Sequence, residues 1–213
     1  MARLATTLTA AAIATAHPAN AEEGYRGYET PRYTVAATAG VVEVRDYAPA
    51  LMAQVTVEAE QSAALRAGFR ILAGYIFGGN VSADKIAMTS PVTQTSSEKI
   101  AMTAPVTQTG DNGNWTVSFM MPGSYTLDTL PIPNNSAVQF VETEPVRKAV
   151  IRYSGWATAN QRARQEAILR DWASAAGIGL TGPAEFAYYD DPMTAPWRRR
   201  NEIAIVVSSM PEG

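Results

Sequence analysis

The sequence contains no cysteine and only one histidine in 213 residues. The absence of cysteine excludes disulfides, thiolate metal ligands and cysteine nucleophiles. The histidine, His17, lies in an N-terminal segment that we expect to be removed from the mature protein. Ser-His-Asp catalysis, an ordinary zinc site and imidazole ligation of a metal cofactor are then excluded as well. Acid–base chemistry would rest on Asp, Glu, Lys and Tyr, and soft metal ligation on Met.

The first 21 residues have the layout of a secretory signal peptide. One basic residue, Arg3, precedes an uncharged stretch over 4–16, and Ala19-Asn20-Ala21 stands before the acidic Glu22. A positive start, an apolar centre and a small-x-small site are the features of secretory signals. We therefore predict a periplasmic or secreted protein. If the segment is instead a retained N-terminal tail, the protein is cytoplasmic.

The sequence also lacks a long apolar run and an excess of positive charge. No later segment approaches the roughly 18 uncharged apolar residues of a membrane-spanning helix, so we predict no membrane span. The chain has 17 basic and 20 acidic residues, and loss of Arg3 leaves 16 against 20, a net charge of −4 instead of −3. This balance argues against a nucleic-acid partner held by phosphate neutralisation. The basic run over 198–200 is more typical of a solvated or ion-paired segment.

Hydrophobic patterns in the first half indicate two strands followed by a helix. The strands are predicted over 41–47 and 51–58, with Ala48-Pro49 between them as a hairpin turn. The helix is predicted over about 60–77, where apolar residues recur at helical spacing before a Gly-Gly stop. The residues expected on its inner face are Leu65, Phe69, Leu72 and Ile76.

The second half repeats this order. Strands are predicted over 137–142 and 147–153 around a Glu-Pro turn, and a helix over about 160–176. Further strands are predicted over 115–121, 186–189 and 203–207.

These patterns predict an α+β fold of two pseudo-repeated strand–strand–helix–strand units, in which antiparallel strands curve around two helices. Each helix would cover apolar sheet surface that could not remain exposed. Neither unit alone would bury much surface, so we predict a single domain over 32–209. A lead-in segment over 22–31 and a short tail over 210–213 flank this domain.

One segment of the sequence is duplicated, as KIAMTSPVTQT over 85–95 and KIAMTAPVTQT over 99–109. The apolar residues of each copy lie two apart, as in a strand, and its proline marks a strand end or edge. We favour two neighbouring strand segments joined as a hairpin. The alternative is a soft-metal site, such as one for copper(I), formed by Met88 and Met102. Because isolated methionines more often fill gaps in a core, we predict no metal site.

The outer side of the helix over 60–77 is a first candidate binding surface. Ala73 and Phe77 lie near Arg66 and Arg70 at helical spacing. An apolar surface edged by guanidinium groups suits a porphyrin, whose propionates can pair with arginine. The alternative is that the arginine stems cover a second layer of packing.

The segment YYDDPMTAPWRRRNEI, residues 188–203, is a second candidate. Exposed Met193, Pro196 and Trp197 beside arginines would suit a flat, apolar, anionic ligand. The alternative is a long loop with an ion-pair network where the chain re-enters the sheet. That network would consist of Arg199, Arg200 and Glu202.

The chain resembles the SOUL heme-binding protein family in segments that occur in the family's order. They are VEVRDY at 42–47, YIFGGN at 75–80, KIAMTAPV at 99–106, WTVSFMMP at 115–122 and YDDPM…RRNEI over 189–203. The resemblance implies a distorted antiparallel β-barrel of two repeated units, flanked by two helices. It also implies binding of heme or another tetrapyrrole through hydrophobic contact with the first helix and a nearby loop.

The resemblance places two binding roles on the first helix. Arg66 stands where a basic residue is thought to help with the propionates, and Phe69 stands where the family has an apolar pocket residue. The loop corresponds to 193–197, where Thr194 and Ala195 replace a lysine of some relatives. Because the mature chain would lack histidine, we expect contact through the porphyrin face and propionates, or weak ligation by Met or Tyr.

The leading hypothesis is a non-enzymatic protein that buffers or carries heme or a related porphyrin. Its candidate ligand-binding residues are Arg66, Phe69, Arg70, Ala73, Met193, Pro196 and Trp197. The alternative is a binding module for another flat hydrophobic ligand, or a protein-interaction domain without heme. An enzyme acting on tetrapyrroles would need an acid or base such as Asp190, Asp191, Glu202 or a tyrosine. Because adjacent aspartates point to opposite sides of an extended chain, we expect no catalytic carboxylate pair.

Overall fold

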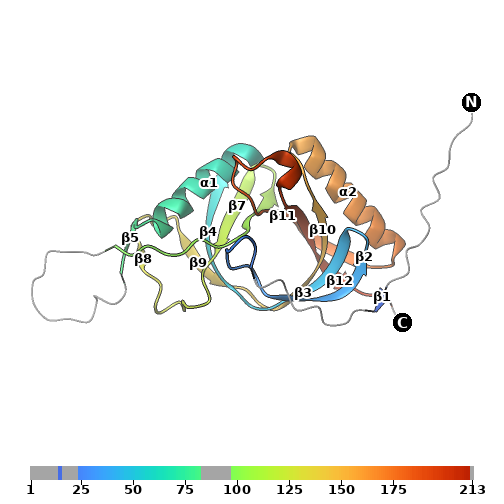
Figure 1. Cartoon of the computed structure of the whole chain (residues 1–213), viewed down its shortest axis with the longest axis horizontal. Helices are drawn as coiled ribbons and strands as arrows, with labels where there is room; N and C mark the ends of the chain where they lie inside the picture. Colours follow the sequence, from blue (N-terminus) through green and yellow to red (C-terminus); the bar gives the residue numbers. More distant parts are fainter. Residues whose placement is uncertain (1–13, 16–23, 83–96, 212–213) are drawn as a thin grey trace, which may run out of the picture.

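The structure is a computed structural model that describes residues 14–15, 24–82 and 97–211. Among these residues, helices α1 (Gln61–Ile76) and α2 (Ala159–Ala175) lie on the outer side of a large antiparallel sheet (Figure 1). The α+β class is confirmed, and the helix bounds differ from the predicted ones by one residue. The strands are β1 (Ala14–Thr15), β2 (Tyr33–Ala39), β3 (Val42–Tyr47), β4 (Leu51–Glu58), β5 (Asn80–Val81), β6 (Val106–Asp111), β7 (Asn114–Met120), β8 (Ile132–Pro133), β9 (Gln139–Glu142), β10 (Val146–Tyr153), β11 (Gly179–Tyr188) and β12 (Asn201–Ser209).

The described strands other than β5 and β8 form one sheet in the order β1-β2-β3-β10-β12-β11-β6-β7-β4-β9. The sheet is strongly curved, with α1 over β4 and β7, and α2 over β10, β11 and β12 (Figure 1). Its two edges in the described part of the chain, β1 and β9, do not pair with each other, because β2 and β1 continue the sheet beyond β3. The expected barrel is therefore not closed here. Equivalence of the two strand–strand–helix units stays a prediction.

The predicted hairpin β3–β4 is wrong, and β9 and β10, on either side of the predicted Glu-Pro turn, do not pair with each other either. β3 pairs with β2 and β10, whereas β4 pairs with β7 and β9. The residues between β3 and β4 form a bend in an extended segment, and the amide of Thr143 donates to the carbonyl of Ala50 at this bend, 2.9 Å away. The two bent segments thus run antiparallel along each other and join the two halves of the sheet. Period-2 alternation identifies a strand but not the strand with which it pairs.

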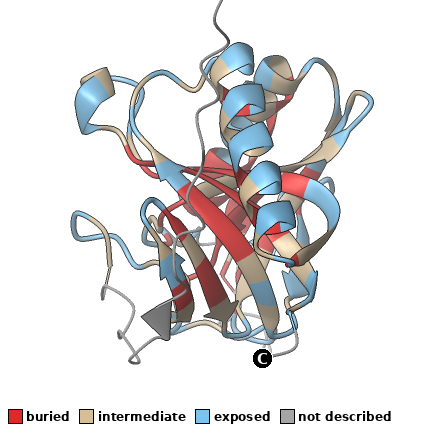
Figure 2. Cartoon of the chain, turned by 90° about the vertical axis from the view of Figure 1, so that its right-hand side faces the viewer, coloured by how far each residue is buried: buried red, intermediate tan, exposed pale blue. Residues whose placement is uncertain are grey.

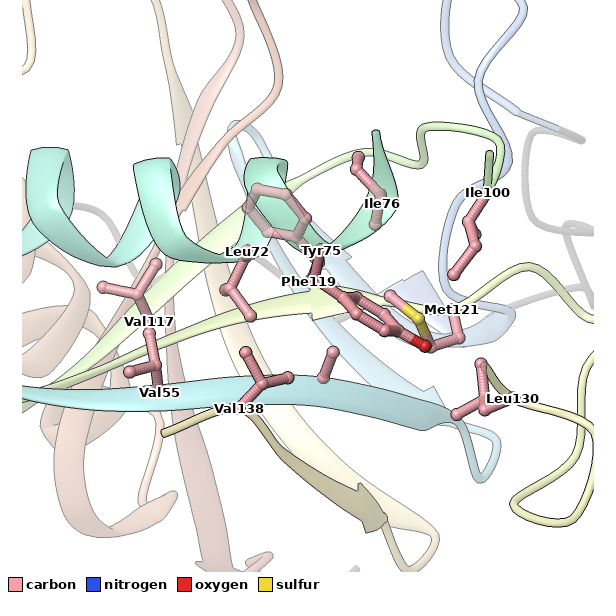
Figure 3. Packing of buried hydrophobic residues seen from close by; sticks show 11 residues of the cluster. Val55, Leu72, Tyr75, Ile76, Ile100, Val117, Phe119, Met121, Leu130 and Val138 are labelled. Atoms are coloured by element: carbon pink, nitrogen blue, oxygen red, sulfur yellow. The ribbon is translucent and has the colours of Figure 1, made fainter. Parts of the chain in front are cut away.

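α1 approaches β7 closely because it carries a glycine on its inner face. A Cβ at the buried Gly68 would lie 2.6 Å from the side chain of Val117. Figure 3 shows Leu72 and Tyr75 of the same helix directed toward the strands. Phe69, which was predicted for the inner face, lies at the margin of this contact and is 39% exposed. The closest contact between α1 and the sheet is therefore made at a glycine, which a hydrophobic pattern in the sequence does not identify.

The first copy of the duplicated phrase, with Met88, lies outside the described residues, so the hairpin between the copies stays a prediction. The second copy is a strand only from Val106, where β6 pairs with β7 and β11. In the irregular part before it, Thr103 Oγ1 donates to the carbonyl of Met120 at 2.7 Å. Met102 packs against the hydrophobic core, which is the gap-filling role of methionine.

Figure 2 shows that burial is concentrated on the strands and on the inner faces of the helices. α2 contributes Leu169 and Ala173 to the core, and its outer face is exposed. In the part of the chain that the structure describes, neither helix is long and apolar enough to cross a membrane.

Candidate functional site

The N-terminal ends of α1 and α2 approach each other at the top of Figure 1, and the β11–β12 connection lies between them. A guanidinium nitrogen of Arg162 in α2 donates to Gln61 Oε1 in α1 at 2.8 Å and links the two ends. The surface here is hollowed into a cleft of about 300 Å³, called the interhelical cleft below. Its lining includes Leu65, Arg66, Trp156, Arg162, Tyr188 and Arg199.

Asp190 fixes the β11–β12 connection. Its carboxylate accepts hydrogen bonds from the amide of Arg200 at 2.6 Å and from the Tyr25 hydroxyl at 3.0 Å, and it pairs with Arg26 at 2.9 Å. The Asp190 side chain is only 2% exposed. Asp190 therefore joins the two ends of the connection and holds the lead-in segment against them. Its carboxylate has a structural role.

Arg199 shapes the wall of the cleft that the connection provides. Its Nε donates to the carbonyl of Thr194 at 2.8 Å, and a terminal nitrogen donates to the carbonyl of Pro192. Its guanidinium lies 4.2 Å from the ring centroid of Trp156, a cation–π contact. The predicted ion-pair network therefore does not include Arg199 among the described residues, because its charge lies on an aromatic ring.

Two residues of the cleft were missed by sequence reasoning. Trp156 is 58% exposed and stands just before Thr158, the N-cap of α2. Its position, as an aromatic residue in a polar segment ahead of a helix, could have indicated a functional role. Arg162 lies in the predicted second helix, where an arginine is expected to face solvent, yet it is buried. No local pattern could have revealed that α1 covers it.

The floor of the cleft is polar. Gln108 of β6 is fully buried and donates to the carbonyl of Gln61 at 2.8 Å. Burial raises the pKa of Tyr188, and the neighbouring Arg162 guanidinium offsets this only in part, so the phenol is protonated at neutral pH. In the described part of the chain, four buried polar atoms in this floor or directly behind it have no hydrogen-bond partner of good geometry. They are Gln61 Nε2, Gln108 Oε1, Arg162 Nε and the Tyr188 hydroxyl.

A buried ionic cluster lies beneath the connection. Glu202 pairs with Arg45 at 2.9 Å and with Arg200 at 2.8 Å, and it accepts a hydrogen bond from the Tyr189 hydroxyl at 2.9 Å. Burial pushes the pKa of Glu202 upward, but the two guanidinium groups outweigh it and hold the pKa below its usual range. The network predicted for Arg200 and Glu202 is confirmed. Because Glu202 is 2% exposed, a substrate could not reach it as an acid or base.

Of the candidate ligand residues on α1, Arg66 lines the interhelical cleft, and within the described residues it makes no ion pair. Phe69 lies on the flank of the helix with its ring centroid 5.5 Å from that of Phe119. Arg70 borders a separate hollow further along the helix. The placement of Ala73 on an outer apolar surface is wrong. It is only 9% exposed, so it offers little surface to a ligand.

The candidate residues of the connection do not line the cleft. Met193 is 92% exposed and Trp197 is 77% exposed. Pro196 begins a short 3-10 helix, Pro196–Arg198, and Trp197 borders another hollow beside Tyr25. The connection instead contributes Pro192 and Arg199 to the cleft.

The cleft can hold a partly apolar, anionic ligand. Leu65 and Trp156 offer apolar surface, and Arg66, Arg162 and Arg199 offer positive charge. Among the residues described here, no group of three or more His, Cys, Asp or Glu is placed to hold a metal ion.

Solved structures of low sequence identity share this fold. The C-terminal domain of EcmrR matches with a TM-score of 0.58 and 11% identity, covering 79% of this chain and 98% of that domain. A hydrolase from Listeria innocua matches with a TM-score of 0.53 and 14% identity, covering 78% and 91% of the two chains. An uncharacterized conserved protein from Listeria innocua has a TM-score of 0.52 and 15% identity, with coverage of 78% and 92%. Such likeness shows the fold alone.

No curated protein sequence matches the chain significantly. The sequence does match the profile described as SOUL heme-binding protein, over residues 28–206. That range contains both helices, the β11–β12 connection and every residue named above as lining the cleft. The chain therefore belongs to the SOUL heme-binding protein family.

Proposed function

We propose that the protein binds heme or a related tetrapyrrole in the interhelical cleft, as a non-enzymatic carrier or buffer. The observation that carries this proposal is the meeting of apolar surface, from Leu65 and Trp156, with the guanidinium groups of Arg66 and Arg199 in one cleft. Membership of the family supports the class of ligand. An apolar wall beside fixed positive charges is the chemistry that a porphyrin with propionates requires.

The size of the cleft supports partial enclosure of the ligand. Its volume of about 300 Å³ lies at the lower end of ligand pockets, which span roughly 300–1,000 Å³. A porphyrin would enter by one edge and leave the rest of the ring in solvent. Such a half-open site suits a protein that takes up its ligand and releases it again.

The residues of the cleft fit the ring and carboxylates of a porphyrin better than they fit iron. Tyr188 is the cleft residue whose side chain type ligates heme iron in other proteins, and burial keeps its phenol protonated. We therefore expect similar affinity for ferric heme and for metal-free protoporphyrin. Bound iron would supply the redox chemistry of heme, while the chain would supply binding and orientation.

Optical titration of the purified protein with ferric heme and with metal-free protoporphyrin tests this function. We expect dissociation constants below roughly 10 μM, about −7 kcal/mol of binding free energy, for both ligands. If neither binds in that range, the tetrapyrrole function is wrong. A sharp Soret shift together with much tighter binding of heme alone would instead show a strong iron ligand.

Arg66→Ala is expected to weaken the binding of both porphyrins about ten-fold, because it removes one exposed guanidinium from the cleft. Arg164→Ala is the matched control, since Arg164 is an exposed arginine of α2 that does not line the cleft. Equal losses in the two variants would mean that only general charge attraction is involved.

A second candidate is favoured by the tip of the β11–β12 connection. Met193 is 92% exposed and Trp197 is 77% exposed outside the cleft, as in a surface that contacts another apolar molecule or protein. This alternative would lead if neither porphyrin binds. We also propose a periplasmic or secreted location, on the signal-like pattern of residues 1–21. N-terminal sequencing of the protein from its native cell tests this location.

A further inference from the structure

The guanidinium of Arg162 is buried without a counter-charge. The residue is 8% exposed, and in the described part of the chain no carboxylate lies within ion-pairing distance of it. The other buried arginines, Arg45 and Arg200, both pair with Glu202. Arg162 therefore differs from the arginines that only stabilise this fold.

The polar atoms around Arg162 leave several donors unused. Its terminal nitrogens donate to the carbonyl of Ala157 and to Gln61 Oε1, which leaves Nε without a partner among the described residues. The Gln61 Nε2 amide is also unpartnered there, and the protonated Tyr188 hydroxyl lies beside the Arg162 guanidinium, so its own proton has no acceptor among the described residues. Arg162 and Tyr188 line the cleft near the positive end of α2, and Gln61 lies behind them, joined to Arg162 through its Oε1. The remaining unpartnered atom, Gln108 Oε1, is an acceptor that a carboxylate would not satisfy.

Leaving these groups unpaired is costly. A buried donor or acceptor without a partner costs roughly 1–3 kcal/mol, and a buried charge costs more. Ordered water could satisfy the amide and the hydroxyl, but water does not neutralise a buried positive charge. The floor is therefore built for a group that brings both acceptor atoms and a negative charge.

The other charges that face the cleft are compatible with an anion. Arg66 and Arg199 add positive charge at its walls. Asp190 borders the cleft as well, but its carboxylate already pairs with Arg26 and accepts hydrogen bonds from Tyr25 and the amide of Arg200.

We propose that Arg162, with the Tyr188 hydroxyl and the Gln61 amide, forms a carboxylate-binding floor in the interhelical cleft. A carboxylate carries one charge and two acceptor oxygens, which match one guanidinium and its neighbouring donors. A phosphate monoester would bring up to two charges against this single buried cation. Resting on the proposed function, the carboxylate is a propionate of the tetrapyrrole, so the ligand must carry a free acid.

The first test compares protoporphyrin IX with its dimethyl ester, which keeps the ring and loses both acids. We expect the wild-type protein to bind the free acid at least ten-fold more tightly than the ester. Arg162→Met should remove most of this preference, although Arg66 and Arg199 remain beside the ligand. Arg164→Met, the same change at an exposed site of α2, should retain it. Tyr188→Phe keeps the aromatic packing and should reduce the preference several-fold, so the test does not depend on one variant.

Equal binding of the acid and the ester by the wild type would overturn the carboxylate floor while the tetrapyrrole function stands. Retention of the preference by both Arg162→Met and Tyr188→Phe would overturn it as well. If neither porphyrin binds, the proposed function fails, and a test without porphyrin decides about the floor.

That test measures the melting temperature with millimolar sodium propionate, propionamide or inorganic phosphate at matched ionic strength. We expect propionate to raise the Tm of the wild type and of Arg164→Met but not that of Arg162→Met, and we expect propionamide to have no effect. No effect of propionate on the wild type, or a larger effect of phosphate, would contradict the assignment.

Discussion

Gly68 determines how closely α1 approaches the sheet, and so where its side chains point. Because a Cβ at this position would lie 2.6 Å from Val117, the helix touches β7 at this point. On the same helix Phe69 is 39% exposed at the margin of this contact, Ala73 is buried and Arg66 lines the cleft. A residue without a side chain thus sets the distance between this helix and the sheet.

Gly68→Ala is expected to lower the free energy of unfolding by about 1–3 kcal/mol, through overpacking against Val117. The higher helix propensity of alanine, about 1 kcal/mol, offsets this only in part. Gly74→Ala in the same helix is the control, because a Cβ there meets nothing within 4 Å. It should stabilise the protein by up to about 1 kcal/mol. Urea unfolding of both variants checks this, and equal effects would contradict the packing at Gly68.

Glu202→Gln is expected to lower the free energy of unfolding at neutral pH by about 3–5 kcal/mol, because it leaves Arg45 and Arg200 buried without their anion. Asp46→Asn breaks the exposed pair with Arg147 and should cost at most about 1 kcal/mol. Similar small losses in both variants, measured by urea unfolding, would show that the buried cluster is not a structural anchor.

Glu202 also makes the free energy of unfolding depend on pH. The folded pKa of Glu202 lies below its ordinary value of 4.5, so the unfolded chain takes up the proton first as pH falls. Its contribution to stability is therefore complete above pH 4.5 and is lost as pH falls through the folded pKa. Unfolding measured from pH 7 down to about pH 3 should show a steeper loss for the wild type than for Glu202→Gln. Parallel curves would contradict the lowered pKa.

At the scale of elements, the β11–β12 connection depends on a residue at its own start. Asp190 binds the amide of Arg200 at its other end and the lead-in residues Tyr25 and Arg26. In the described part of the chain, the Asp191 carboxylate accepts a hydrogen bond from the amide of Met193, within the connection itself. The adjacent aspartates therefore have different structural roles.

Asp190→Asn is expected to loosen the connection, because the ion pair with Arg26 is lost. Limited trypsin digestion should then cleave at residues 198–200 several-fold faster than in the wild type. Asp191→Asn should change the rate much less, since its contact is local. If both variants are cut at the wild-type rate, Asp190 does not hold the connection.

Elements with a local signal were predicted well, and their arrangement was not. Both helices and the strands β3, β4, β7 and β10 follow from periodicity and breakers, so their bounds agree closely with the structure. β2 was not predicted, and β11 begins at Gly179, well before the predicted start at 186. Strand partners depend on the whole sheet, which explains the wrong hairpin at β3–β4. Among the cleft residues, Arg66 was predicted from its position on the helix. Arg162 and Trp156 could not be predicted without knowing that the N-terminal ends of the two helices meet. Gly68 was missed because glycine carries no hydrophobic signal.

At the scale of the whole molecule, the bent segments β3–β4 and β9–β10 join two sheet halves, each covered by one helix. This arrangement brings the N-terminal ends of the helices together and places the β11–β12 connection between them (Figure 1). The cleft is thus a product of the architecture and not of one motif. We expect the ligand to bind in this cleft.

The most direct test places a tryptophan in the cleft and another outside it. Ser62 is exposed and lines the cleft, whereas Gly74 lies on the same helix at the separate hollow beside Arg70. The dissociation constant for metal-free protoporphyrin should rise at least ten-fold in Ser62→Trp and remain at the wild-type value in Gly74→Trp. Unchanged binding in Ser62→Trp, or a loss only in Gly74→Trp, would contradict the account and place the ligand elsewhere on α1.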